Sequence, residues 1–160
     1  MTKAKIGVIG AGWWATEFHI PHLKEREDVE LISVCKLEED QLKFVKEKFG
    51  FKYASTDYLE ALDFEKLDGV VIATPHFAHY ENTKAALDRG YHVAVEKPMT
   101  TNTKDAQAIY DLVKEKNVEL LTPYGFNWNP LMAKAEKHVE DGMLGKIQHV
   151  DTSFSSSLVD

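Results

Sequence analysis

The chain has 160 residues, enough for one domain with a buried core, and its 44% hydrophobic and 28% charged residues are ordinary for a globular protein. Its formal net charge of -7 argues against a nucleic-acid partner or an anionic membrane surface, and no apolar run approaches the ~20 residues of a membrane span. The single cysteine, Cys35, excludes an internal disulfide and no signal peptide is evident, so we expect a cytoplasmic protein.

Apolar runs alternate with helical patterns along the first 123 residues. The expected strands cover residues 5–9, 29–35, 51–54, 69–74, 92–97 and 118–123. The expected helices cover residues 13–25, 38–50, 56–64, 76–90 and 103–117. Pro21 must end or kink the first helix. This alternation predicts an α/β fold, a doubly wound parallel sheet with right-handed crossovers, over residues 1–123.

Residues 124–160 have a different pattern. Residues 129–145 are expected to form one more helix. Residues 146–154 alternate apolar and polar side chains, unlike the earlier buried strands, so we expect them to begin a second, half-exposed sheet. An unpaired strand of this kind is an edge ready to pair, which predicts a homo-oligomer.

A glycine-rich segment follows the first expected strand. Residues 10–15, "GAGWWA", fit the pattern G-x-G-x-x-[GA] of a dinucleotide-binding turn. Gly10 would allow the tight turn, Gly12 would let the backbone approach a pyrophosphate, and Ala15 would let the helix pack closely on the strand. The start of the helix offers free N–H groups to the anion. The alternative is a plain tight turn.

Ala11, Trp13 and Trp14 fill the variable positions of this turn and are candidate cofactor contacts. We expect one tryptophan to pack on the sheet and the other to lie near the pyrophosphate or the nicotinamide. The alternative is that both tryptophans belong to the core.

The end of the second strand discriminates between the two nicotinamide cofactors. An acid about 20 residues after the glycines would bind the 2′-hydroxyl of the adenosine ribose. Lys36 stands at that place, and a cation there suits a 2′-phosphate instead. Two alternatives stay open: Glu38 or Glu39 reaches the hydroxyl, or Lys36 is a solvated surface charge. We expect NADP or NAD, with NADP slightly favoured.

The segment "ATPHFAH" follows the fourth strand, at the sheet edge where ligands bind in open α/β folds. Its residues Ala73, Thr74, Pro75, His76 and His79 are therefore candidate contacts to the nicotinamide half of the cofactor. The two histidines are three residues apart, but no third ligand is evident, so we expect no metal.

The segment "VEKP" ends the fifth strand at the same edge. Glu96 and Lys97 are candidate cofactor contacts, and a lysine beside a cationic nicotinamide in a partly dry cleft suits proton transfer, which makes Lys97 the candidate catalytic residue. The alternative is a surface lysine paired with Glu96. His19 and His22 are expected to be structural or to lie at the cleft rim.

On these residues the chain resembles the Gfo/Idh/MocA family of NAD(P)-dependent oxidoreductases. The resemblance rests on "VIGAGWWA", "VVIATPHFAH", "VAVEKP" and "YGFNWNP", in this order and spacing. It implies an N-terminal Rossmann domain and a C-terminal open-faced sheet domain that supplies much of the substrate pocket. It also implies hydride transfer to or from a hydroxyl or carbonyl of a sugar, inositol or related polyol.

The resemblance further implies that Lys97 contacts the substrate hydroxyl and the nicotinamide ribose and that Glu96 helps to orient the cofactor. Asn127 and Trp128 of the last motif are further candidate cofactor contacts.

Three departures from the family pattern bear on function. Members usually carry a partner of Lys97 in the second domain, of which residues 124–160 match only the linking helix and the first strand. We therefore expect a truncated substrate domain. Trp128 stands where an arginine is frequent, and Lys36 replaces the acid of NAD-preferring members. Two functions follow: an oxidoreductase, or a non-catalytic dinucleotide-binding module or fragment that lacks the substrate domain.

Overall fold

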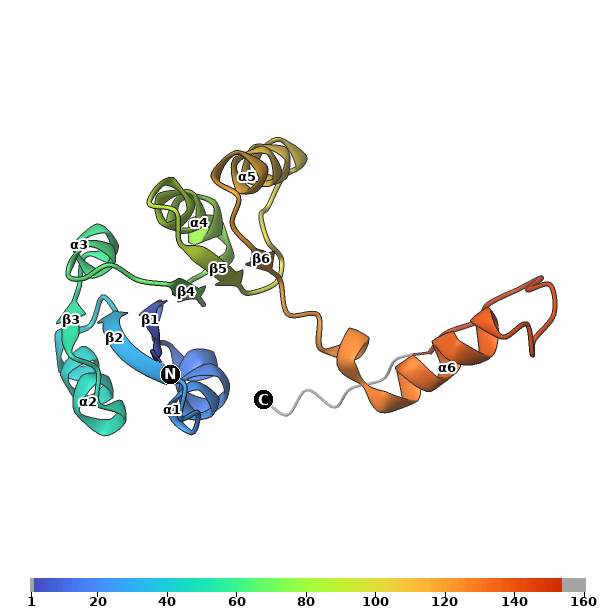
Figure 1. The fold of residues 1–160 in the computed structure, drawn as a ribbon, viewed down its shortest axis with the longest axis horizontal. Coiled ribbons are helices and arrows are strands. Elements are labelled where there is room, and N and C mark those ends of the chain that lie inside the picture. Colours follow the sequence, from blue (N-terminus) through green and yellow to red (C-terminus); the bar gives the residue numbers. More distant parts are fainter. Residues whose placement is uncertain (1, 154–160) are drawn as a thin grey trace. The chain divides into compact units, whose positions relative to one another are not determined.

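The computed structural model describes residues 2–153, apart from the side chains of residues 126 and 127, and its contacts divide the chain into two compact units after Pro123. The first unit contains a six-stranded sheet in the order β3-β2-β1-β4-β5-β6, with every pair parallel (Figure 1). The strands are β1 Ala4–Ile9, β2 Val29–Cys35, β3 Tyr53–Ser55, β4 Gly69–Ile72, β5 His92–Val95 and β6 Leu120–Leu121. The predicted doubly wound α/β fold is confirmed, because this is the strand order of a Rossmann sheet.

Helices cover both faces of the sheet (Figure 1). They are α1 Ile20–Lys24, α2 Glu39–Phe49, α3 Tyr58–Asp63, α4 His79–Asp88 and α5 Thr103–Lys116. Successive strand residues point to opposite faces, so Val8 joins the core beneath α1 and α2 while Ile9 joins the core beneath α3, α4 and α5. The sheet is therefore buried on both faces, as its continuous apolar strands predict.

The first helical segment has an unusual turn. A π-helical turn, η1 Ala15–His19, precedes α1, and the N–H of Ile20 donates to the carbonyl of Ala15 five residues earlier. Pro21 follows directly, and it has no N–H to continue the regular ladder. The expected break at Pro21 is thus a widened turn just before the proline, and the helix continues to Lys24.

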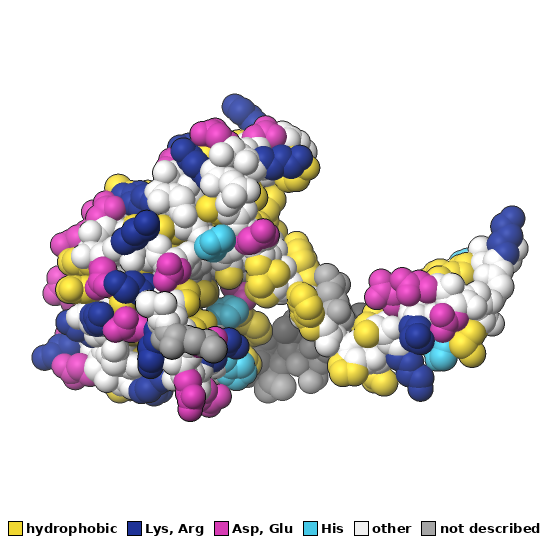
Figure 2. Space-filling model, in the orientation of Figure 1, with side chains coloured by type: hydrophobic (Ala, Val, Ile, Leu, Met, Phe, Trp, Pro, Cys, Tyr) yellow, Lys and Arg dark blue, Asp and Glu magenta, His cyan; other side chains and the backbone are white. Residues whose placement is uncertain are grey.

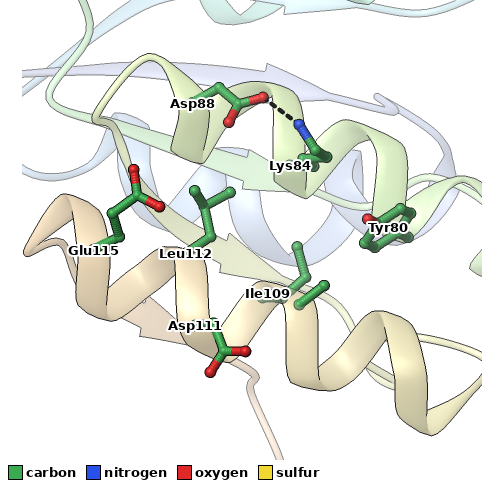
Figure 3. Close-up of a pocket in the computed structure, with 8 residues that line it drawn as sticks. Tyr80, Lys84, Asp88, Ile109, Asp111, Leu112 and Glu115 are labelled. Carbon is green, nitrogen blue, oxygen red and sulfur yellow. Dashed lines mark hydrogen bonds and ion pairs between the residues drawn. The ribbon is translucent and has the colours of Figure 1, made fainter.

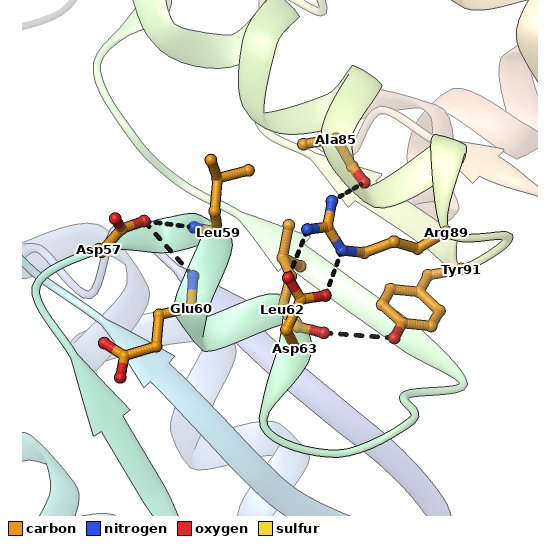
Figure 4. Close-up of polar contacts among 8 residues, drawn as sticks. All are labelled: Asp57, Leu59, Glu60, Leu62, Asp63, Ala85, Arg89 and Tyr91. Atoms are coloured by element: carbon orange, nitrogen blue, oxygen red, sulfur yellow. Dashed lines mark hydrogen bonds and ion pairs between the residues drawn. The ribbon is translucent and has the colours of Figure 1, made fainter.

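Three polar contacts fix α3 against its neighbours (Figure 4). Asp57 caps α3 by accepting hydrogen bonds from backbone N–H groups of its first turn. The guanidinium of Arg89 donates to both carboxylate oxygens of Asp63, at 2.6 and 2.7 Å. The hydroxyl of Tyr91 donates to a carbonyl of α3 at 3.2 Å. These contacts tie α3 to the end of α4 and to the start of β5.

Five strands depart from their expected ranges. β1 starts one residue early, β3 starts and ends later than residues 51–54, and β4, β5 and β6 end two residues before their expected ends, with β6 also starting two residues late. After β4 a short loop leads into the 3-10 turn η2 His76–Ala78 and then into α4, and after β5 a loop leads to α5.

The second unit contains the 3-10 turn η3 Gly125–Trp128 and helix α6 Pro130–Glu140. Asn129 caps α6 by accepting a hydrogen bond from the N–H of Leu131 at 2.9 Å. The helix ends five residues before the expected residue 145, ahead of Gly142 with its positive φ of 71°.

The strand expected over residues 146–154 is wrong for residues 146–153, which form no strand, and residue 154 lies outside the described residues. A strand is stable only when its backbone groups pair with a neighbour, and no other strand belongs to the described part of this unit. The expectation of a homo-oligomer rested on that strand and loses its basis.

Charged side chains of both signs are interspersed over the visible face of the first unit (Figure 2). None of the helices in the described part of the chain is long and apolar enough to cross a membrane.

Candidate functional site

The carboxyl ends of β1 and β4 lie side by side at the point where the helix layers change. The chain enters the α1 layer after β1 and the α4 layer after β4, although the two strands pair. Diverging connections of this kind open a crevice at the strand ends. A cavity of about 400 Å³ lies there, lined by the turn after β1, the end of β2 and the loop after β4.

The glycine turn forms the floor of this cavity. Gly10 has a φ of +88°, and a Cβ atom there would lie 2.6 Å from the backbone nitrogen of Thr74. Gly12 is different, because a Cβ atom there would meet nothing within 4 Å. Gly10 thus serves the close approach of β1 to β4, while the space above Gly12 is left for a ligand.

Backbone contacts anchor the turn to the second strand and to the helix. The N–H groups of Gly10 and Ala11 both donate to the carbonyl of Cys35, at 3.0 and 3.1 Å. The N–H of Thr16 donates to the carbonyl of Gly12 at 3.0 Å, and Ala15 is fully buried against the sheet. The predicted packing role of Ala15 therefore agrees with its position.

Lys36 lines the same cavity, directly after Cys35 at the end of β2. Its side chain is only 14% exposed, and its ammonium lies 2.9 Å from a carboxylate oxygen of Glu38. The hydrogen bond from Lys36 holds the pKa of the Glu38 carboxyl below its usual range. Leu37 and Phe77 also line the cavity while remaining about four-fifths exposed, at 80% and 82%. The lining therefore includes one cation and two largely exposed apolar side chains.

A second cavity, of about 200 Å³, shares Ala73 and Thr74 with the first. Trp14, His76, His79, Glu96 and Lys97 complete its lining. The candidate residues of the turn, of the loop after β4 and of the end of β5 thus line two adjoining cavities at one edge of the sheet.

Glu96 is the buried acid of the second cavity, and both of its carboxylate oxygens accept hydrogen bonds. Oε1 accepts from Nε1 of Trp14 at 2.8 Å and lies 2.7 Å from Nε2 of His19. Oε2 accepts from the N–H of Lys97 at 3.2 Å. Burial alone would raise the pKa of Glu96, but these hydrogen bonds outweigh burial and hold the pKa below its ordinary value. The carboxylate is therefore ionised at neutral pH.

Lys97 is half exposed, with 53% of its side chain accessible, and its ammonium lies 3.9 Å from Oε2 of Glu96. The same ammonium lies 5.3 Å from the ring centroid of Trp14, within the range of a cation–π contact. The alternative of a lysine paired with Glu96 thus describes the geometry correctly, and it is compatible with a lysine that also faces a ligand.

The two histidines that follow β4 differ in environment: His76 lies in the 3-10 turn His76–Ala78, and His79 begins α4. His76 is exposed, whereas His79 is fully buried. The two ring nitrogens of His79 lie 2.7 and 2.8 Å from the carbonyl oxygens of Pro98 and Thr74. Both nitrogens are therefore occupied by backbone contacts that join the loop after β4 to the turn after β5. Among the described residues, no group of three His, Cys, Asp or Glu side chains is placed to hold a metal ion.

The expectation that one tryptophan packs on the sheet is wrong, and so is the alternative that both belong to the core, whereas Trp14 does line the second cavity. Trp13 is 69% exposed and Trp14 is 41% exposed, so neither belongs to the core. Ala15 and Ile20 occupy the buried positions of this helical segment instead. Both tryptophan rings pack against Phe18, with ring centroids 5.7 and 4.3 Å away, and of these three aromatic residues Trp14 lines the second cavity.

Asn127 and Trp128 belong to the second unit. The side chain of residue 127 lies outside the described residues, and Trp128 is 73% exposed. Their roles as cofactor contacts stay predictions.

Sequence reasoning missed several residues at the site. His19, expected only to be structural or at the rim, bonds the carboxylate of Glu96. Asn82 lines the first cavity and accepts a hydrogen bond from the hydroxyl of Thr74 at 3.0 Å. Its position three residues after His79, near the start of α4, was the available signal. Cys35 lines the cavity too, but burial, aided by the charge of Asp57, raises the pKa of its thiol to about 11, so it is not a nucleophile at neutral pH.

A further cavity of about 180 Å³ lies between α4 and α5, away from the carboxyl edge of the sheet (Figure 3). Lys84 is paired with Asp88 at 2.7 Å, and the remaining charged groups, Asp111 and Glu115, are acidic. The lining of this groove therefore offers no unpaired cation to the phosphates of a dinucleotide.

The oxidoreductase family with the NAD-binding Rossmann fold, Gfo/Idh/MocA, matches residues 4–124. The chain belongs to this family. It is 34% identical to a levoglucosan dehydrogenase from Pseudarthrobacter phenanthrenivorans over 62% of this chain and 26% of that protein. It is 31% identical to a 4-carboxy-2-hydroxymuconate-6-semialdehyde dehydrogenase from a Sphingobium species over 92% of this chain and 46% of that protein. The chain thus spans less than half the length of these curated relatives.

Among solved structures, the myo-inositol 2-dehydrogenase of Lactobacillus plantarum has a TM-score of 0.82 and 28% sequence identity. The match covers 91% of this chain and 43% of that one. The predicted family resemblance and the predicted nicotinamide-dinucleotide fold are both confirmed by these matches.

Proposed function

We propose that this chain is the dinucleotide-binding part of an NAD(P)-dependent oxidoreductase that acts on a hydroxyl or carbonyl of a sugar, inositol or related polyol. The observation that carries the proposal is the juxtaposition of two adjoining cavities, one floored by Gly12 and the other lined by Lys97, which share Ala73 and Thr74. Such a juxtaposition provides room for an extended dinucleotide and places a proton-transfer group beside one end of it.

The described residues fit a dinucleotide. The open space above Gly12 suits a pyrophosphate, because a side chain at this position would fill it. Lys36 would hold the phosphate or ribose at the adenosine end, and the loop from Ala73 to His76 would border the nicotinamide end. When bound, the dinucleotide supplies the ring carbon that accepts or donates a hydride.

Lys97 is positioned to exchange a proton with a substrate bound in the second cavity. Its ammonium is held at 3.9 Å from Glu96 and remains half exposed towards the second cavity. In reduction the ammonium would give a proton to the new alkoxide oxygen and become a neutral amine; in oxidation the ammonium would first lose a proton to solvent, and the neutral amine would then take the proton from the substrate hydroxyl. Glu96 would keep a negative charge beside this ammonium and orient it.

The substrate class comes from relatives. The similarity to levoglucosan and myo-inositol dehydrogenases supports a polyhydroxylated substrate, and the similarity to a semialdehyde dehydrogenase supports a carbonyl substrate. The family resemblance implies a second domain that supplies much of the substrate pocket, so we propose that the 160-residue chain alone binds the dinucleotide and turns over polyols poorly.

The test uses the whole protein that contains this chain and three proteins: wild type, Lys97→Ala and the control Lys104→Ala on exposed helix α5. NADH and NADPH binding is measured by titration, and hydride transfer is followed at 340 nm with a panel of polyols and their ketones. Loss of Lys97 should lower turnover by ~10²–10⁴ with cofactor affinity nearly intact, while the control retains wild-type turnover.

Three results would overturn parts of this proposal. Absence of dinucleotide binding by the wild type contradicts the site itself. Binding without turnover of any substrate supports a non-catalytic binding module instead. Turnover of Lys97→Ala within a few-fold of wild type makes this lysine structural.

A further inference from the structure

Two side chains of one helical segment converge on a single carboxylate oxygen. Nε1 of Trp14 and Nε2 of His19 lie 2.8 and 2.7 Å from Oε1 of Glu96. Carboxylates accept hydrogen bonds, so His19 presents a protonated Nε2 to this oxygen. The side chain of Glu96 is only 10% exposed, and its second oxygen accepts from the backbone of Lys97. The acid is therefore held in one orientation by donors on both oxygens.

The π-helical turn explains how two residues five apart reach the same atom. In a regular α-helix each residue advances by about 100°, so side chains five apart point about 140° away from each other. The wider turn over Ala15–His19, closed by the bond from Ile20 N–H to the Ala15 carbonyl, brings Trp14 and His19 to one side. Single π turns of this kind are frequently found at functional sites.

The indole of Trp14 links this acid to the ammonium of Lys97. Its N–H edge faces Glu96, and its ring face lies 5.3 Å from Nζ of Lys97. Trp13 and Phe18 pack against the same indole, with centroids 5.8 and 4.3 Å away. The side chain of Lys97 is half exposed to solvent. On its other side, its ammonium contacts the Trp14 ring and the Glu96 carboxylate.

We propose that His19 is a positioning residue for Lys97: by fixing the Glu96 carboxylate together with Trp14, it sets where the lysine ammonium lies. The inference about ammonium placement stands on geometry alone, and its consequence for turnover rests on the proposed function. The other histidines of the cavity, His76 in the 3-10 turn after β4 and His79 at the start of α4, do not bond Glu96.

The primary test needs no turnover. The 160-residue chain is acetylated at pH 8 with a limiting amount of acetic anhydride, and the modification rate of Lys97 is measured by peptide mass spectrometry, with Lys104 as internal reference. His19→Leu removes the donor to Glu96. His19→Gln keeps an N–H group at a similar reach, and His22→Leu is the matched control, because His22 is exposed on the same helical segment.

Release of the ammonium from the ring and the carboxylate should raise the rate at Lys97 by about two- to fivefold in His19→Leu, the range expected for loss of an exposed cation–π contact. His19→Gln and His22→Leu should retain the wild-type rate. Equal rates in wild type and His19→Leu, with both chains folded by circular dichroism, would overturn the proposal.

A variant of Trp14 and the kinetics of the whole protein provide two further tests. Should His19→Leu fail to fold, Trp14→Phe carries the test, since it keeps an aromatic face at an exposed position and removes the N–H bond to Glu96. It should raise the same rate, and an unchanged rate would contradict the proposal. In the whole protein, His19→Leu should lower kcat while cofactor KM stays within about twofold, and His19→Gln should restore kcat. A shift in Lys97 reactivity without any wild-type turnover would refute the proposed function and leave the positioning role intact.

Discussion

Lys36 and Glu38 form an ion pair at the end of β2, with the lysine ammonium 2.9 Å from the glutamate Oε2. The lysine side chain is 14% exposed and lines the cavity, whereas the glutamate side chain is 60% exposed. A 2′-phosphate bound here would compete with Glu38 for the same cation. We therefore predict that the pair sets the balance between the two nicotinamide cofactors.

We expect NADPH to bind more tightly than NADH, by roughly 5- to 30-fold, because Lys36 offers a point charge to the 2′-phosphate without the bidentate fork of arginine. Lys36→Asp should reverse the order, and Glu38→Gln should widen the wild-type gap by freeing the lysine. Calorimetric titration of both cofactors at two salt concentrations checks this, since added salt should narrow the gap. Equal wild-type affinities, or no reversal in Lys36→Asp, would make Lys36 a surface charge only.

The two glycines of the turn should respond differently to substitution. Gly10→Ala should lower the free energy of unfolding by about 3 kcal/mol, because it strains a positive φ and drives a Cβ atom into Thr74. Gly12→Val should leave stability nearly unchanged and abolish dinucleotide binding, because its side chain would fill open space. Urea unfolding and cofactor titration separate the two effects. Wild-type affinity in Gly12→Val would contradict the pyrophosphate assignment.

His79 should contribute to stability and His76 should not. His79→Leu removes the contacts to the carbonyls of Thr74 and Pro98 in a fully buried site, and we expect a loss of about 2–4 kcal/mol. His76→Leu, the exposed counterpart three residues earlier, should change the free energy of unfolding by less than about 0.5 kcal/mol. Thermal and urea unfolding of both variants provide the comparison, and similar losses would show that the two carbonyls do not depend on His79.

Glu96 should make the fold sensitive to acid. Its pKa in the folded chain lies below its ordinary value, so the stabilisation is present above the unfolded carboxyl pKa of about 4.3 and is lost as the pH falls through the folded pKa. Glu96→Gln should therefore be less stable than wild type at pH 7, and the difference should shrink below pH 4. Glu17→Gln, an exposed control on the neighbouring helical segment, should show no such trend. A difference that is constant with pH would contradict the ionised state of Glu96.

The parallel sheet could be predicted because its strands carry short apolar runs and its glycine turn has a recognisable spacing. Gly10 and Gly12 follow β1, and Glu96 and Lys97 follow β5, so their common position at the carboxyl edge of the sheet follows from topology. The bond between His19 and Glu96 could not be predicted, because helical periodicity would place His19 on another side from Trp14. Only the π turn brings them together.

The strand expected over residues 146–154 shows another limit of local pattern. Alternating side chains indicate a face that a strand would bury, but they supply no partner for its backbone. Residues 146–153 are not paired in the described structure. Local pattern also misled for the tryptophans. Their apolar character predicted that at least one of them packs on the sheet, but Ala15 and Ile20 fill the buried positions of this segment.

The pairing of Ile9 in β1 with Ile72 in β4 has a consequence for the order of folding. The first cavity takes its lining from Ile9 through Asn82, so it has no opposite wall until those two strands have closed a long loop. During synthesis the glycine turn emerges well before β4, and for that interval it is a turn without a ligand site. A dinucleotide that binds in this cavity therefore stabilises only chains in which β1 and β4 have already paired. Binding would therefore indicate that β1 and β4 have paired, even before β5 and β6 join the sheet.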